Sequence, residues 1–282
     1  MKALFSRCVF LFCMTGFLMC CNTGAKKVSE NNIQFDSLFI DRTYHLLGVE
    51  TNPKCSLNIQ FSYPVNYSNG EVLNLVQKQF VSSFFGDEYV NISPVEAAEK
   101  YADDYVAAYR AEENDFKHDK EKHGSDPLES WYSYNETKNS QIVYNRNDIL
   151  SFVVFTEYFK GGAHSAHTYT NRVIDLKTGL RIAENEIFVD DYQDALAKII
   201  VDGIALANTV EVSELENIGF FDVNEIYPNK NFYVDDTGIT YTFNEYEIAA
   251  YVVGPVTVQI PFEKIRHLLR RESPVAHIAF RQ

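Results

Sequence analysis

Several parts of this chain alternate apolar and polar residues with the period of a β-strand. In the stretch 35–65, Leu57, Ile59 and Phe61 alternate with polar residues, which predicts two or three strands with one buried face. The run 149–159 is almost wholly apolar and predicts a central strand that is covered on both faces. The same kind of pattern predicts further strands at residues 131–144, 168–176, 239–243 and 256–260.

Other segments carry the helical period. Apolar residues recur at helical spacing over 72–84, and the repeat stops near Gly86, where a helix would end. Ser93 and Glu96 form the pattern of a capping box with Pro94 at the first helical position, so a second helix should begin there. Two further amphipathic helices are predicted at 192–203 and 262–269, and a solvated helix end that runs into a loop at 112–126.

The mixture of these elements predicts an α+β fold. We expect antiparallel sheets with helices packed on one side, arranged as two lobes of similar size. Hydrophobic residues make up 46% of the chain and aromatic residues 14%, so a chain of this length can bury a substantial core. The sequence contains no internal repeat and no low-complexity tract.

The charge of the chain restricts its partners. The formal net charge is −14, and removal of residues 1–20 would make it −16, because Lys2 and Arg7 are the only charged residues there. Such a surface repels nucleic acid, so no nucleic-acid partner is expected. Electrostatic steering would favour a cationic partner, although the same acidity could simply keep an exported protein soluble.

The first residues have the pattern of an export signal for a lipoprotein. Basic residues precede an apolar run in 1–20, and Cys20 supplies a small residue before Cys21. We therefore predict a signal peptide at 1–20, acylation of Cys21 and a flexible tether at 21–34, with an ordinary secretory signal as the alternative. The N-terminal lipid would hold an exported protein at the envelope membrane. Because no acidic cluster follows Cys21, the periplasmic side is favoured over the cell surface.

One cysteine remains in the predicted folded part. Cys55 lies in a predicted strand and has no second cysteine with which to form an internal disulfide. A buried, inert thiol is therefore expected there.

Residues 157–167, EYFKGGAHSAH, contain the first candidate for chemistry. Gly161 and Gly162 follow the predicted central strand, where glycine lets the backbone leave a sheet. His164 and His167 could bind a metal together with a carboxylate such as Glu157. An isolated H-x-x-H outside a helix is a weak pattern, so we favour a structural role in which His164 bonds a neighbouring backbone group. No cofactor is predicted.

A second candidate is a pair of carboxylates. Glu245 and Glu247 flank Tyr246 beside a predicted strand, and two neighbouring carboxylates can act as acid and base in glycan hydrolysis. A solvated acidic rim is the favoured interpretation, and no catalytic residue is predicted. The alternative is an envelope hydrolase that acts on glycan through Glu247 and His164.

Residues 158–164, 175–179, 187–188, 243–255 and 258–262 together resemble a domain pair from bacterial envelope proteins. The first domain is similar to the N-terminal region of the deacetylase PdaC and the second to the extracellular C-terminal domain of the anti-sigma factor RsiV. We interpret the shared motif residues as fold determinants. They are Gly161, Gly162, Ala163, His164, Asp175, Gly179, Tyr246, Glu247, Gly254, Pro255 and Pro261.

The resemblance implies a domain order and a kind of function. It implies a PdaC-like domain at 35–164, an RsiV-like domain at 165–272 and a tail at 273–282. We expect neither the membrane-spanning helix of the anti-sigma factor nor the separate catalytic domain of the deacetylase. What the resemblance implies is a non-catalytic, lipid-anchored binding protein that recognises a cell-wall fragment or a protein ligand, such as a cationic lysozyme.

Overall fold

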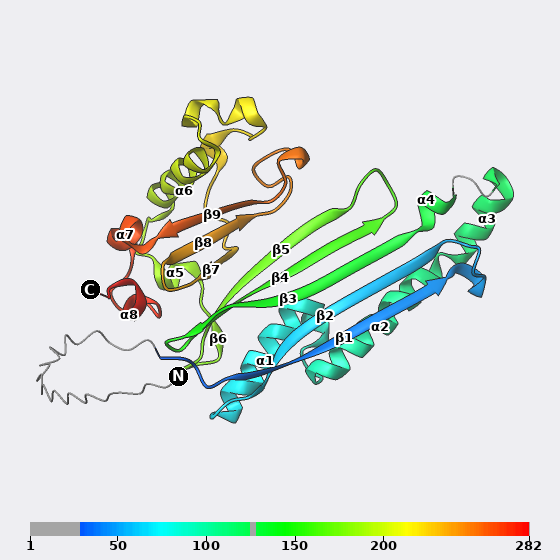
Figure 1. Ribbon diagram of the computed structural model, residues 1–282, viewed down its shortest axis with the longest axis horizontal. Coiled ribbons are helices and arrows are strands. Elements are labelled where there is room, and N and C mark those ends of the chain that lie inside the picture. The colour runs from blue at the N-terminus through cyan, green and yellow to red at the C-terminus, as the bar shows by residue number, and fades with distance from the viewer. Residues whose placement is uncertain (1–28, 125–127, 282) are drawn as a thin grey trace, which may run out of the picture.

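A computed structural model describes residues 29–124 and 128–281 of the chain. The predicted signal peptide, the predicted acylation site Cys21 and most of the predicted tether lie outside the described residues. The described part forms two lobes around two separate sheets (Figure 1). The fold is α+β, as predicted.

The first lobe is built on a six-stranded sheet in which the strands follow one another in sequence order. Its strands are β1 (Gln34–His45), β2 (Lys54–Asn66), β3 (Tyr134–Arg146), β4 (Ile149–Lys160), β5 (Ala166–Asp175) and β6 (Leu180–Arg181). All neighbours pair antiparallel except β2 and β3, which are parallel. The prediction of purely antiparallel sheets is therefore wrong at this pair. The reason is that a long helical connection between β2 and β3 returns the chain to the end of the sheet where β2 began.

That connection supplies the helical layer of the first lobe. It contains α1 (Gly70–Phe85), α2 (Pro94–Ala111), α3 (Glu113–His123) and α4 (Leu128–Tyr132). In Figure 1 the strands of the large sheet lie in front of α1 and α2, which cover its far face. Phe61 of β2 packs against Phe84 and Phe85 of α1, with ring centroids 4.6 and 4.8 Å apart.

Local sequence signals set most of these boundaries. The predicted capping box is present, because Ser93 and Glu96 each accept a hydrogen bond from the other's backbone N–H. On α2, Ala97 and Ala98 are buried, whereas Val95 is 47% exposed. Trp131 lies in α4 rather than in a strand. The stretch 112–126 is helical as far as His123.

The second lobe is built on an antiparallel three-stranded sheet in the order β7-β8-β9. Its elements are α5 (Glu184–Ile187), α6 (Gln193–Asn208), β7 (Phe232–Val234), β8 (Gly238–Phe243), β9 (Val256–Pro261), α7 (Phe262–Ile265) and α8 (Ala276–Ala279). Every residue of β8 is buried, so this strand forms the centre of the lobe. The predicted helix at 262–269 is shorter than expected, since α7 gives way to a 3-10 turn at Arg266.

Short 3-10 turns connect these elements. They are Leu46–Gly48, Asp87–Tyr89, Val212–Glu214, Glu216–Ile218, Val223–Glu225, Tyr251–Val253 and Arg266–Leu268. No helix in the part of the chain that the structure describes is both long enough and apolar enough to span a bilayer.

Two of the expected domain boundaries fall within continuous parts of the fold. The limit between 164 and 165 falls in the turn that joins β4 to β5, so the large sheet also contains β5 and β6 from the segment assigned to the second domain. The described part of the expected tail, residues 273–281, packs back onto the second lobe, where Val275 and Ile278 are buried in its core.

Buried tyrosines make the fold sensitive to alkaline pH. Burial is the main cause that raises the pKa of all seven buried tyrosines above the usual value. They are Tyr63, Tyr89, Tyr109, Tyr132, Tyr144, Tyr192 and Tyr241. In the unfolded chain these phenols ionise near pH 10, whereas in the folded chain they stay protonated. Their contribution to stability is therefore complete below about pH 10 and is lost above it.

We expect the free energy of unfolding to fall above pH 10 by about 1.4 kcal/mol per pH unit for each such tyrosine. Urea unfolding followed by circular dichroism at several alkaline pH values, with tyrosinate absorbance recorded in parallel, measures this. Tyr241→Phe should make the fall less steep. Titration of all tyrosines near pH 10 in the folded protein would contradict the prediction.

Candidate binding face of the large sheet

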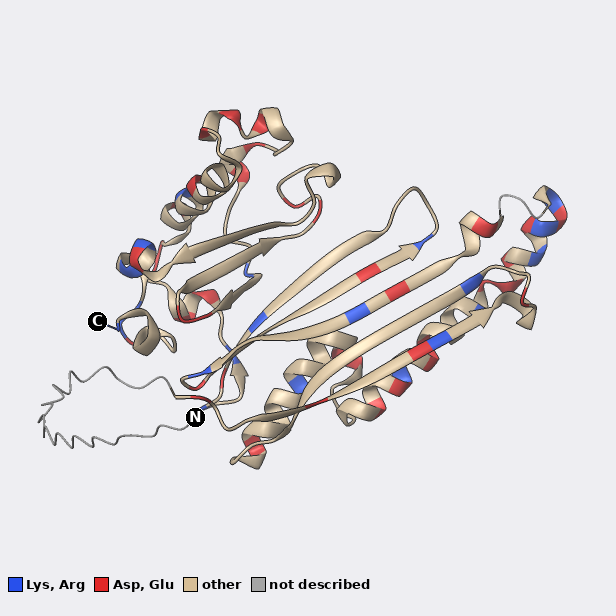
Figure 2. Cartoon of the chain, viewed as in Figure 1, with Lys and Arg blue, Asp and Glu red and all other residues tan. Residues whose placement is uncertain are grey.

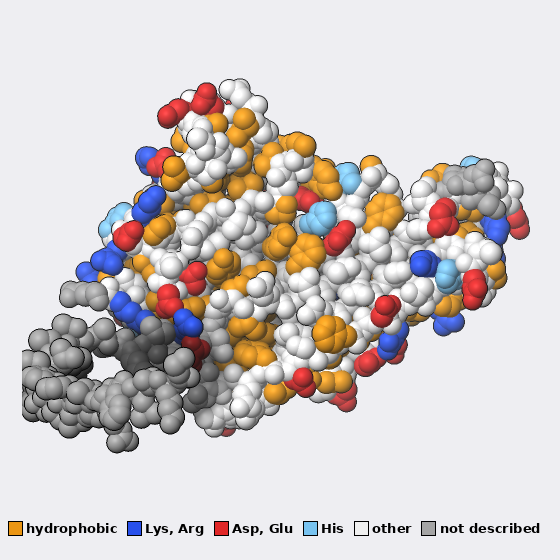
Figure 3. Space-filling view, in the orientation of Figure 1, with side chains coloured by type: hydrophobic (Ala, Val, Ile, Leu, Met, Phe, Trp, Pro, Cys, Tyr) orange, Lys and Arg blue, Asp and Glu red, His pale blue; other side chains and the backbone are white. Residues whose placement is uncertain are grey.

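The large sheet has one face that the helices leave uncovered, and we call it the open face. The prediction that the strand at 149–159 is covered on both faces is therefore wrong for the second half of β4, where Phe155 and Glu157 lie on the open face and are only partly buried. Successive residues of a strand point to opposite faces. In β2, Ile59 is buried under the helices, whereas Asn58 and Gln60 point away from them and are exposed. Figure 3 looks onto the open face and shows a broad area of uncharged polar side chains and backbone with a few separate hydrophobic side chains.

Charged residues are sparse on this face. Figure 2 shows that most of the acidic and basic residues lie on helices and loops, and that few interrupt the strands of the large sheet. The contrast is marked because the whole chain carries a formal charge of −14. A nearly neutral surface on so acidic a protein favours neutral polar ligands over strongly charged ones.

Side-chain amides dominate the polar part of the open face. Five of them lie on β2 and β3: Asn58, Gln60, Asn135, Asn139 and Gln141. Within the described ranges none of the five side chains hydrogen-bonds to another residue. Each amide therefore keeps two N–H donors and one carbonyl acceptor free for a ligand or for water.

The strand register aligns some of these amides with aromatic rings. Phe39 of β1 lies opposite Gln60, and Gln60 lies opposite Asn139. Asn139 in turn lies opposite Phe155 of β4, which lies opposite Tyr169 of β5. These five residues, one from each strand, form a single line across the open face, which we call the cross-strand row. With strands ~4.8 Å apart it spans roughly 19 Å.

The rings of the cross-strand row are accessible. Phe39 is 72% exposed, although it is a large apolar residue in a regular strand. At the other end, the rings of Phe155 and Tyr169 lie 5.0 Å apart and tilted by 49°, and both are partly buried. Two amides thus lie between aromatic rings, an arrangement that can stack against apolar surfaces and hydrogen-bond polar groups in one ligand.

A neighbouring row has a charged end. Asp41, Asn58, Thr137, Glu157 and His167 face one another in the same way. His167 Nε2 lies 3.8 Å from Glu157 Oε1, and His167 Nδ1 lies 2.7 Å from Glu245 Oε1. The His167 imidazole therefore lies between two carboxylates.

Glu245 does not belong to a solvated rim. Its side chain is only 7% exposed, and its Oε2 atom accepts a hydrogen bond from the backbone N–H of His167 at 3.0 Å. The interpretation of Glu245 as a solvated acidic residue was therefore wrong, because its carboxylate accepts a hydrogen bond from the backbone at the edge of β5. Glu247 is exposed and accepts a hydrogen bond from Asn229 Nδ2 at 2.7 Å.

Glu245 is one of three side chains that cover the free edge of β5. Asn231 Oδ1 accepts from the backbone N–H of Asn171, and Asn244 Oδ1 accepts from that of Tyr169, both at 2.7 Å. We call Asn231, Asn244 and Glu245 the edge clamp. They satisfy every second N–H of β5 from 167 to 171, so they protect the edge and fix the second lobe beside the open face.

The two histidines of the H-x-x-H pattern point to different partners. His164 is exposed, its Nδ1 lies 3.0 Å from the carbonyl oxygen of the neighbouring Ser165, and its ring stacks on Tyr251 with centroids 3.8 Å apart. This bond to adjacent backbone is the structural role that the sequence favoured. Across residues 29–124 and 128–281, no three His, Cys, Asp or Glu side chains converge as a metal site would require.

Most of the other motif residues lie in turns. Gly161 and Gly162 have φ values of +80° and +110° after β4, and a Cβ on Gly161 would lie 2.9 Å from the carbonyl oxygen of Trp131. Tyr246 also has a positive φ, +66°, and is 59% exposed. The remaining positions are Ala163 in the β4–β5 turn, Asp175 at the end of β5, Gly179 in the β5–β6 turn, Gly254 and Pro255 before β9, and Pro261 at the end of β9.

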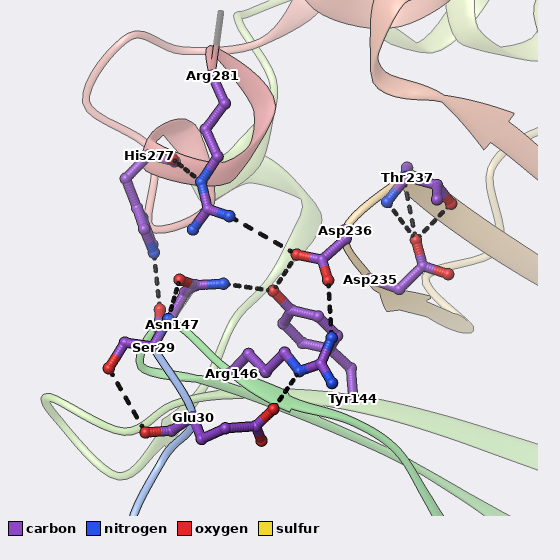
Figure 4. A network of polar contacts seen from close by, with 11 residues as sticks. Ser29, Glu30, Tyr144, Arg146, Asn147, Asp235, Asp236, Thr237, His277 and Arg281 are labelled. Carbon is purple, nitrogen blue, oxygen red and sulfur yellow. Dashed lines mark hydrogen bonds and ion pairs between the residues drawn. The ribbon is translucent and has the colours of Figure 1, made fainter. Parts of the chain in front are cut away.

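The other end of the open face is closed by a polar network at the junction of the lobes (Figure 4). Asp236, in the β7–β8 turn, accepts a hydrogen bond from Tyr144 Oη at 2.8 Å and forms ion pairs with Arg146 and Arg281. Glu30, near the start of the described chain, pairs with Arg146 at 2.7 Å. The network joins both ends of the described chain to β3 and to the second lobe.

Cys55 lies beneath the sheet and away from the open face. It is fully buried, and burial raises the pKa of its thiol above the usual value. Its position agrees with the buried thiol that the sequence predicts.

Comparisons with known proteins agree with this architecture. Residues 50–167 match the family model described as "Deacetylase PdaC", and residues 185–263 match the one described as "Protein of unknown function (DUF3298)". A PdaC-like region precedes a DUF3298 region in this chain. The predicted order of a PdaC-like and an RsiV-like domain is therefore confirmed, and both kinds of region are found in envelope proteins.

Structures of DUF3298 family members resemble most of the chain. A crystal structure of a DUF3298 family member from Bacteroides fragilis NCTC 9343 is 28% identical and has a TM-score of 0.84, covering 90% of this chain and 100% of that one. A DUF3298 family protein from Pseudomonas aeruginosa PAO1 is 12% identical with a TM-score of 0.58, covering 86% and 96%, and shows a likeness of fold alone. A search of curated proteins found no match.

Proposed function

We propose that this protein is a non-catalytic envelope binding protein that recognises a neutral glycan segment of the cell wall on its open face. The observation that carries the proposal is the cross-strand row, in which Gln60 and Asn139 lie between Phe39 and the pair Phe155 and Tyr169.

The chemistry of the row fits a sugar chain. A pyranose ring presents an apolar face that can stack on an aromatic side chain. Its hydroxyl groups both donate and accept hydrogen bonds, so they require acceptors and donors on the protein. Free amides supply both from one side chain. A row of roughly 19 Å across five strands offers room for several sugar units in line. The sparse charge on the open face favours a neutral chain over an anionic polymer.

The predicted lipid would place this face in the right compartment. Acylation at Cys21 would hold the protein at the envelope membrane, with the periplasmic side favoured over the cell surface. The first described residues, Ser29 and Glu30, lie at the closed end of the open face, next to Asn147 and Arg146. A chain tethered from that end would leave the rest of the face free to reach the wall.

The amides of Gln60 and Asn139 make no hydrogen bond within the described protein, so replacing them removes ligand contacts without breaking internal ones. We expect Asn139→Ala and Gln60→Ala each to weaken binding of N-acetylglucosamine oligomers, which are uncharged like the backbone of wall glycan, about tenfold, which is about 1.4 kcal/mol. Phe155→Ala should weaken it by at least as much. Isothermal titration calorimetry measures these affinities. Asn91→Ala, an exposed amide between α1 and α2, is the matched control and should bind like the unaltered protein.

Three results would refute the glycan proposal in different ways. Equal binding by all variants would remove the open face as the site. Binding of lysozyme instead of glycan, weakened by salt and unchanged in Asn139→Ala, would favour the cationic protein ligand suggested by charge. Release of shortened glycan that Glu247→Gln abolishes would favour the hydrolase.

A further inference from the structure

We infer that two copies of this chain associate through β1, edge to edge and antiparallel, about a two-fold axis at Phe39. Strand β1 is at the end of the large sheet and pairs only with β2. It is twelve residues long, and most of it is exposed or half-buried. An edge of this length is a template for pairing with another strand unless it is blocked.

The hydrogen bonds at this edge show which backbone groups point outward. The N–H of Ser37 donates to the side chain of Asp36 at 2.8 Å, and the carbonyl of Asp41 accepts from the side chain of Arg42 at 3.3 Å. Both groups therefore point away from β2. In an antiparallel pair, alternate residues direct both backbone groups to the same side. Phe39, midway between Ser37 and Asp41, must also point its N–H and carbonyl outward.

A pairing centred on Phe39 is complementary in backbone and side chain. Phe39 would exchange two hydrogen bonds with its own copy, and Ser37 would lie opposite Asp41 of the second copy. In this register Asp36 lies opposite Arg42 of the second copy, and Leu38 lies opposite Ile40. Opposite charges and apolar residues facing across strands both stabilise a sheet. Because the axis is two-fold, each of these pairs occurs twice.

The two charged residues would exchange partners when the copies meet. In the single chain, Asp36 and Arg42 occupy outward backbone groups of their own strand, and Arg42 also pairs with Glu99 at 2.5 Å. That pair is solvent-exposed on both sides, so little stability is lost when it opens. The side chains that cover the edge in the monomer thus become the cross-strand pairs of the dimer.

The pairing would also join the two open faces. Phe39 ends the cross-strand row, so the two-fold axis would place the rows of both copies end to end on one twelve-stranded sheet. The inference does not depend on glycan binding, because it concerns only the backbone edge and the side chains of β1.

Disulfide trapping in the full chain tests the register. Phe39→Cys should give a dimer on non-reducing electrophoresis of envelope preparations, since residues directly opposite in a hydrogen-bonded pair have Cα atoms ~5.5 Å apart, within disulfide range. Ser37→Cys is the matched control. Its two copies would be four residues out of register, roughly 14 Å along the strand, and should not crosslink.

Charge reversal separates this register from other contacts. In the Phe39→Cys background, Arg42→Asp should reduce the amount of trapped dimer at least fivefold. Adding Asp36→Arg to the Arg42→Asp protein should restore most of the dimer. Equal trapping of Ser37→Cys and Phe39→Cys would overturn the inference. The absence of a Phe39→Cys dimer would also overturn it. The same holds if adding Asp36→Arg to Arg42→Asp does not restore the trapped dimer although the thermal unfolding of the protein is unchanged.

Discussion

Replacing Gly238 with alanine should unfold the second lobe or lower its free energy of unfolding by more than about 3 kcal/mol. Gly238 begins β8, and a Cβ there would lie 2.0 Å from the carbonyl oxygen of Ile260 in β9. The clash is with backbone, so no side-chain rotation relieves it, and the two strands must separate. The buried core around Tyr241 and Phe243 would open with them.

Urea unfolding followed by circular dichroism measures the Gly238→Ala loss. Gly70→Ala is the control, because a Cβ at Gly70, in the first turn of α1, meets no described atom within 4 Å. That change should be neutral or slightly stabilising. A Gly238→Ala protein with an unaltered unfolding midpoint would show that β8 and β9 are not held at this spacing.

Removing the Asn231 side chain should lower the free energy of unfolding by about 2–4 kcal/mol. The amide accepts from the backbone N–H of Asn171 and donates to the carbonyls of Tyr169 and Thr242. Asn231→Ala would leave these partly buried backbone groups without partners, and the edge clamp would lose its central contact. The second lobe should then move more freely beside β5.

Two measurements separate this effect from general damage. Amide hydrogen exchange should accelerate most at the clamped N–H groups of β5, and urea unfolding should report the global loss. Asn58→Ala removes an exposed amide that has no described partner, so it should change stability by less than about 0.5 kcal/mol. Unchanged exchange at Asn171 in Asn231→Ala would contradict the role of the clamp.

The candidate site illustrates which features local sequence patterns can predict. Alternation at Leu57, Ile59 and Phe61 identified the covered face of β2, and by exclusion it placed Asn58 and Gln60 on the other face. The same reasoning did not reveal the cross-strand row. A row depends on the register between strands, and β3 reaches β2 only through a helical connection from 70 to 132.

The edge clamp was missed for a related reason. Asn231 lies in a loop, and nothing in its neighbourhood distinguishes it from other turn-forming asparagines. Its acceptor atom is aligned with Asn171, sixty residues away, only because β5 and the second lobe pack together. Glu245 was noticed but interpreted as solvated, since periodicity along one segment carries no information about the edge of a distant strand.

The sequence by itself determined the α+β class, the covered face of β2 and the capping box of α2, because each follows from periodicity or from contacts between near neighbours in the chain. The order of the two regions was implied by the resemblance of its motifs to known domains. The tertiary structure alone decided the parallel pairing of β2 with β3, the alignment of rings and amides across five strands, and the burial of Glu245. These depend on the relative placement of segments far apart in the chain, and that placement results from packing of the whole core.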